Sequence, residues 1–111
     1  MSYNVYPTPD FKKYLKRLSK KYPSLKSDLQ GLITILKDKP DSGTQLGHGI
    51  HKIRMAITSK GKGKSGGARV ITYLVTEDNE VYLVFIYDKS QLENITKEQI
   101  LKMVQKSGLK G

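Results

Sequence analysis

The chain has 111 residues, of which 20 are lysine or arginine and 10 are aspartate or glutamate, so its formal net charge is +10. This length allows one hydrophobic core, and we expect a single domain over residues 1–111. Cysteine is absent, which excludes disulfides, thiolate nucleophiles and thiolate metal ligands. The sequence has no apolar run of membrane-spanning length and no signal pattern at its start, so we expect a cytoplasmic protein with no membrane partner.

The excess of positive charge favours a polyanionic partner. In so small a protein it creates a field that attracts nucleic acid, which is the partner we predict. Anionic lipid or an acidic protein segment would be attracted by the same field. Many basic residues also serve only to keep a domain soluble.

The first third of the chain predicts a strand followed by two helices. Residues 3–6 form a short β-prone run. Helical spacing of apolar residues then predicts one helix between Thr8 and Pro23 and another between Ser24 and Pro40, with Thr8 and Ser24 as capping residues. The two helices should form an antiparallel hairpin. Lysines on the outer side of the first helix indicate a solvated face or, less readily, a track for RNA or the ribosome: Lys12, Lys13 and Lys16.

The middle of the chain predicts a loop, a strand, a second loop and a β-hairpin. Residues 41–49 are rich in turn formers and should be a loop. A strand follows in which Lys52 and Arg54 alternate with apolar residues and therefore share one face. Residues 58–67 form a glycine-rich basic loop. Two β-branched, apolar runs around a turn at residues 77–80 then predict the hairpin.

The last element is a helix over residues 97–106. Thr96 and Gln99 fit a capping box, Ile95 and Ile100 fit a hydrophobic staple, and Gly108 can stop the helix. The order β-α-α-β-β-β-α predicts an α+β fold. We expect an antiparallel sheet covered by the helical hairpin on one face and open on the other.

The chemistry is predicted at the basic end of this sheet. No acidic residue occurs between Ser42 and Thr76. Arg69 begins the strand next to that of Lys52 and Arg54, so the three cations can converge on the open face. Three lysines of the loop can add phosphate contacts: Lys60, Lys62 and Lys64. The plainer alternative is a patch of surface lysines around a flexible loop.

Other catalytic chemistries fit the sequence poorly. The loop does not complete a Walker A motif, because threonine stands at position 58 where glycine is needed. The acidic residues at 77–80 lie in a turn far from the cations, so we expect no metal and no cofactor. His48 and His51 could act as acid and base, although we favour a role at the rim, with His51 contacting RNA.

The remaining groups suit cleavage of RNA, which carries its own nucleophile. The 2′-hydroxyl attacks the adjacent phosphate if a protein aligns the strand, accepts a proton, stabilises the added charge and protonates the leaving 5′-oxygen. Lysine, arginine and tyrosine can supply these functions.

Three segments of the sequence resemble the RelE/HigB family of type II toxin-antitoxin toxins: HKIR, KGKGKSGGARVITY and IYDKSQ. The resemblance implies the RelE-like microbial ribonuclease fold and metal-independent cleavage of messenger RNA in the 30S A site. It also implies a HigA-like helix-turn-helix antitoxin as partner. The family's active-site positions correspond to Lys52, Arg54 and Arg69, with Tyr87 and Lys89 as further members.

The sequence departs from the family pattern after Lys89. RelE-like members have an arginine where this chain has Ser90, and no tyrosine follows in the C-terminal segment, so the general base is unassigned. Two other functions are compatible with the same fold. One is a non-catalytic toxin such as a ParE-like gyrase inhibitor, against which the three cations argue, and the other is a basic nucleic-acid-binding module.

Overall fold

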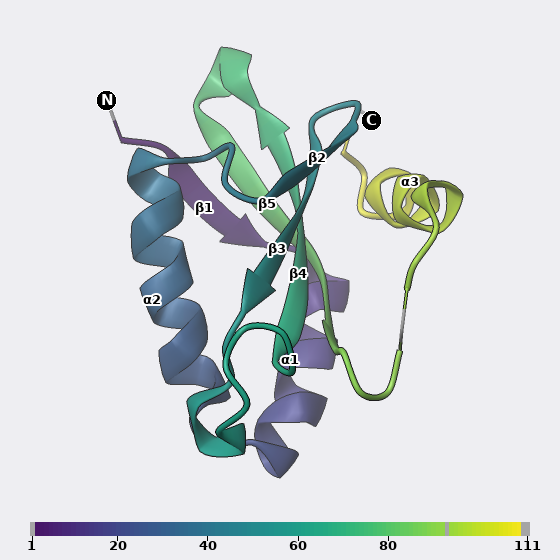
Figure 1. Ribbon diagram of the computed structural model, residues 1–111. Helices are drawn as coiled ribbons and strands as arrows, with labels where there is room; N and C mark the ends of the chain where they lie inside the picture. Colours follow the sequence, from purple (N-terminus) through teal and green to yellow (C-terminus); the bar gives the residue numbers. More distant parts are fainter. Residues whose placement is uncertain (1, 93, 110–111) are drawn as a thin grey trace.

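The computed structural model describes residues 2–92 and 94–109 (Figure 1). Within these residues no helix is both long and apolar enough to cross a lipid bilayer. The regular elements, in chain order, are β1 (Asn4–Pro7), α1 (Pro9–Lys21), α2 (Leu25–Asp38), β2 (Thr44–Gly47), β3 (Ile50–Met55), η1 (Thr58–Lys60), β4 (Ala68–Val75), η2 (Thr76–Asp78), β5 (Glu80–Asp88) and α3 (Lys97–Lys106). The α+β class that the sequence predicts is confirmed.

The strands form one sheet in the order β1-β5-β4-β3-β2. Strands β3, β4 and β5 pair antiparallel, as predicted, and β2 also pairs antiparallel with β3. The prediction of a wholly antiparallel sheet is wrong, because β1 pairs parallel with β5 and makes the sheet mixed. Asn4 pairs with Glu80 and Pro7 with Leu83, positions that are far apart in the chain. The helical hairpin and strands β2, β3 and β4 lie between these two strands in the chain, and a connection of this length permits the parallel pairing.

The segment 41–49, expected to be a loop, contains the edge strand β2. Only three pairs join β2 to β3, and the register shifts between Gln45 and Gly47. Gly43 approaches β3 so closely that a Cβ atom there would lie 2.4 Å from the carbonyl oxygen of Lys52. A strand as short as β2 is stabilised mainly by its pairing with β3. Its sequence lacks the alternation of apolar and polar residues that would predict a strand.

The two sides of the sheet are covered unequally (Figure 1). Helices α1 and α2 pack on one face over a core that includes Ile53, Val70 and Ile86. The other face, expected to be open, is partly covered by α3, where Ile100 and Val104 pack against a smaller core. Beyond α3, this second face continues toward the end of the sheet at which β4 begins (Figure 1).

The helix ends follow the sequence signals with one exception. Thr8 caps α1 by accepting a hydrogen bond from the N–H of Phe11, as predicted. Ser24 makes no such capping bond at α2. Its hydroxyl instead donates to Asp28 and accepts from the N–H of Ser59, so it ties α2 to η1.

Helix α3 has the predicted bounds and a complete capping box between Thr96 and Gln99. Thr96→Ala should lower the free energy of unfolding by about 1 kcal/mol, because an N–H at the helix start loses its acceptor. Urea unfolding measures this change. Thr34→Ala, an exposed threonine inside α2, is the control, and a loss there equal to that of Thr96→Ala would contradict the capping argument.

Candidate nucleic-acid interface

Two rows of side chains cross the sheet on the face that carries α3. Arg54 of β3 pairs with Arg69 of β4, and Arg69 pairs with Tyr87 of β5. Residues paired across neighbouring strands project from the same face, so these three side chains form one row. Lys52 lies two residues before Arg54 and begins the adjacent row on the same face. The register thus brings Lys52, Arg54 and Arg69 together.

The members of these rows differ in exposure. Arg54 is exposed and Lys52 is half-buried, so both can meet a ligand directly. Arg69 and Tyr87 are only 7% and 5% exposed. A substrate phosphate can therefore reach Arg54 and Lys52 in this conformation, whereas contact with Arg69 requires a neighbouring segment to move.

That segment is the glycine-rich loop. The guanidinium of Arg69 donates to the carbonyl oxygens of Lys64 at 3.0 Å, Ser65 at 3.2 Å and Ala68 at 3.1 Å. Arg69 was expected at an exposed strand end, and its burial under the loop is a correction to that expectation. In the conformation described, its donors hold the loop against the sheet.

Tyr87 adds a buried hydroxyl to the row. Among the described residues this hydroxyl has no hydrogen-bond partner. Burial raises the pKa of Tyr87, and the charge of Arg69 opposes that rise. The hydroxyl is therefore protonated at neutral pH, and it can donate a proton or a hydrogen bond but cannot serve as a resting base.

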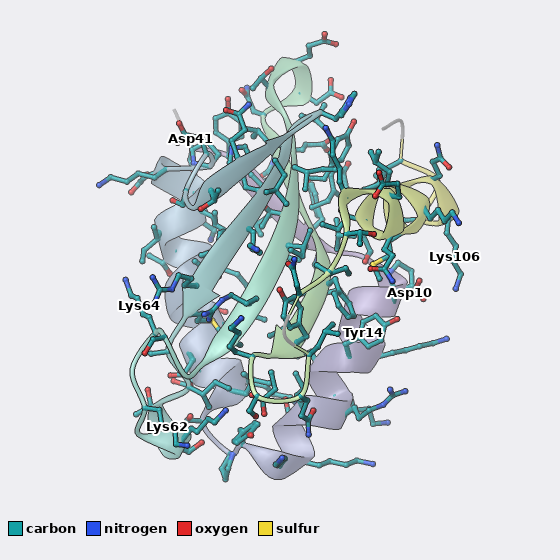
Figure 2. The ribbon with its side chains drawn as sticks, turned by 45° about the vertical axis from the view of Figure 1, so that its right-hand side comes forward. Asp10, Tyr14, Asp41, Lys62, Lys64 and Lys106 are labelled. Carbon is teal, nitrogen blue, oxygen red and sulfur yellow. The ribbon has the colours of Figure 1, made fainter. Side chains whose placement is uncertain are left out.

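Lys60, expected to contact RNA, is instead part of the internal structure. Its ammonium group lies 2.7 Å from the carboxylate of Asp88 and 3.2 Å from the hydroxyl of Ser90, and it sits over the ring of Tyr22. The hydrogen bond to Asp88 raises the pKa of Lys60, so its ammonium group stays protonated at neutral pH. Lys62 and Lys64 are exposed and project from the loop (Figure 2), where they remain available to a polyanion.

Asp88 anchors this network and was not singled out from the sequence. The residue is 1% exposed, and its carboxylate accepts hydrogen bonds from Lys60, from the hydroxyl of Tyr22, and from both the N–H and the hydroxyl of Ser90. Burial by itself would raise the pKa of Asp88, but these donors outweigh it and hold the pKa far below its usual value. A buried carboxylate requires hydrogen-bond or ion-pair partners. The one local sequence signal for the network around Asp88 is therefore an aspartate at the end of an apolar central strand.

The other expected contacts are placed as follows. His51 is 4% exposed and lies on the face opposite Lys52, with Nδ1 3.3 Å from the carbonyl oxygen of Gly49, so the structure contradicts a surface contact with RNA. Lys89 is half-buried, and its N–H donates to the carbonyl oxygen of Gly67. Three lysines are exposed along α1: Lys12, Lys13 and Lys16.

In residues 2–92 and 94–109 no three histidine, aspartate or glutamate side chains gather as a metal site.

Comparison with known proteins identifies the family and the fold. A family profile described as the RelE toxin of the RelE / RelB toxin-antitoxin system matches residues 4–109. The chain is also similar to the solved structure of the Escherichia coli toxin RelE, a mutant with two arginines replaced by alanine, in the free state, with a TM-score of 0.63. The match covers 96% of this chain and 97% of that chain at 14% sequence identity, so it shows a shared fold.

Proposed function

The chain belongs to the RelE toxin family, and we propose on this basis that it is a metal-independent endoribonuclease that cuts messenger RNA on the ribosome in the cytoplasm. The observation that carries the proposal is the row of Arg54, Arg69 and Tyr87, with Lys52 beside it, on one face of the sheet. Clustered cations of this kind stabilise an added negative charge on a phosphate.

Each residue of the row has a role in this reaction. The RNA 2′-hydroxyl attacks the adjacent phosphate and gives up its proton to solvent water, while Arg54 and Lys52, which are accessible, bind the phosphate and align it. Arg69 would exchange its bonds to loop carbonyls for bonds to the phosphate oxygens, whose charge grows in the transition state. Tyr87 or Lys89 would supply the proton to the departing 5′-oxygen.

The partners follow from family and charge. We propose an antitoxin of the HigA-like helix-turn-helix type whose acidic segment covers the basic face and blocks access to RNA. We further propose that exposed lysines of α1 and the loop contact the 30S A site, where ribosomal RNA supplies negative charge: Lys12, Lys13, Lys16, Lys62 and Lys64.

The proposal is tested by brief, tightly controlled expression in bacteria followed by primer extension on matched translated and untranslated transcripts. The wild-type chain should produce cuts only in translated frames. In the double variant Lys52→Ala/Arg54→Ala the amount of cleavage should fall at least about 10²-fold, because the accessible phosphate contacts are removed.

A charge-matched control separates site chemistry from net charge. Lys37→Ala/Lys39→Ala removes two exposed cations at the end of α2 and should cut like the wild type. Growth arrest without any cuts would contradict the proposal and favour a gyrase inhibitor of the same fold. Equal loss of cutting in both double variants would show that only overall charge matters.

A further inference from the structure

A hollow of about 200 Å³ lies where β5 meets α1, next to the row of cations. Its volume suits a single planar ring system and is smaller than the pockets that take drug-sized ligands. Its lining includes Asp88, whose carboxylate is already bonded to Lys60, Tyr22 and Ser90. Six other lining residues are Tyr14, Arg17, Phe85, Tyr87, Gln91 and Leu92. Of these residues, only Tyr87 has a role in the reaction proposed for this protein.

Three aromatic residues, Tyr14, Phe85 and Tyr87, form one part of the lining of the hollow. Tyr14 meets Phe85 edge to face, with ring centroids 4.6 Å apart, and Phe85 lies 5.6 Å from Tyr87. Tyr14 is half-buried, so part of its ring is accessible from the hollow, and Leu92 is an exposed large apolar side chain at the rim. Figure 2 shows Tyr14 on the side of the molecule where the chain leads from β5 to α3. Aromatic and apolar walls of this kind accept the face of another ring.

The polar groups of the hollow suit a base with an attached phosphate. Gln91 is exposed and carries an amide that both donates and accepts, as the edge of a nucleobase requires. Tyr87 contributes the buried hydroxyl that has no partner among the described residues. The guanidinium of Arg17 lies 5.9 Å from the ring centre of Tyr14, so a positive charge stands beside the aromatic wall.

The position of the hollow connects it to the phosphate site. Tyr87 lines the hollow and also ends the row that begins at Arg54. Neighbouring strands lie roughly 4.8 Å apart, so β3 and β5 are on the order of 10 Å apart across the sheet. Adjacent nucleotides of one RNA strand can span this separation.

We propose that this hollow is a nucleobase subsite, which takes one unpaired base of the RNA next to the phosphate held by the cations of β3 and β4. Unpaired RNA bases are commonly recognised by stacking on aromatic side chains and by hydrogen bonds to their edges. Gln91 reads the base edge, while Tyr14 and Leu92 hold its face. The inference rests on the proposed function, because an RNA substrate is what brings a base to this position.

The test is an NMR titration of the free protein with each of the four nucleoside 5′-monophosphates. Shift changes should occur at Tyr14, Phe85 and Leu92, and the affinities should differ among the four bases. Leu92→Ala should weaken binding about tenfold by removing part of the wall. Gln91→Ala should reduce the difference between bases, whereas Gln30→Ala, an exposed glutamine of α2, should leave it unchanged.

Two outcomes would overturn the subsite. One is shift changes confined to Lys52 and Arg54 with equal affinity for all four bases, which would show that the phosphate alone is bound. The other is no shift change at the hollow with any nucleotide. Both are independent of cleavage, so failure of the subsite is distinguishable from failure of the ribonuclease proposal, which primer extension decides.

Discussion

Arg69→Ala is expected to lower the rate of messenger cleavage about 10²- to 10³-fold, the usual effect of removing one hydrogen-bond donor from a developing negative charge. The structure adds a second effect. The guanidinium also bonds the carbonyl oxygens of Lys64, Ser65 and Ala68, so the alanine variant should unfold about 2 kcal/mol more easily. Cleavage of ribosome-bound messenger and urea unfolding, measured on the same preparations, give the two effects separately.

Arg69→Lys divides the two roles further. Lysine keeps the positive charge but lacks the planar fork that reaches two carbonyl oxygens at once, so it should restore part of the cleavage rate and little of the stability. Lys26→Ala, which removes an exposed cation of α2, should leave both quantities near wild type. Cleavage by Arg69→Ala at the wild-type rate would remove Arg69 from the site.

The features predicted correctly from sequence are those encoded locally. The bounds of α3 follow from Thr96, Gln99 and Gly108, because a capping box and a left-handed glycine act within a few residues of the helix ends. The shared face of Lys52 and Arg54 follows in the same way from the two-residue period of a strand. Such signals do not depend on where the rest of the chain lies.

The features that sequence did not reveal depend on distant segments. The parallel pairing of β1 with β5 joins residues that lie far apart in the chain, as Asn4 and Glu80 do. The ion pair of Lys60 with Asp88 spans 28 positions and turns an expected surface lysine into a half-buried one. Arg69 is buried under the glycine-rich loop, and the conformation of that loop could not be predicted because glycine accepts many backbone conformations. Burial of the site is thus a tertiary property, and alternation along one strand could not predict it.

The largest loss of stability is expected for Asp88→Ala. Asp88 has a fully buried side chain, and removing it leaves Lys60, whose side chain is only 11% exposed, without its counter-charge. Breaking a buried pair by deleting one partner lowers the free energy of unfolding by about 3–5 kcal/mol. For a domain whose total stability is about 5–15 kcal/mol, this is a large share. Urea unfolding near neutral pH measures the loss.

Two comparisons decide whether the cause is the buried pair. Asp10 and Lys106, both labelled in Figure 2, form an ion pair of 3.5 Å at the surface. Asp10→Ala breaks this pair and should lower the free energy of unfolding by less than about 1 kcal/mol. The double variant Lys60→Met/Asp88→Leu replaces both charges by apolar groups and should recover most of the lost stability. If the double variant is no more stable than Asp88→Ala, the loss comes from packing or from the bonds to Tyr22 and Ser90.

The same pair predicts how stability depends on pH. The pKa of Asp88 is lowered in the folded state, so its contribution is present above the unfolded pKa of about 3.9 and is lost as pH falls below it toward the folded pKa. The stability difference between the wild type and Asp88→Asn should therefore be constant from about pH 5 to pH 7 and shrink below about pH 4. A difference that stays constant down to about pH 2.5 would show that Asp88 titrates normally in the folded protein and would remove it as the electrostatic anchor of the glycine-rich loop.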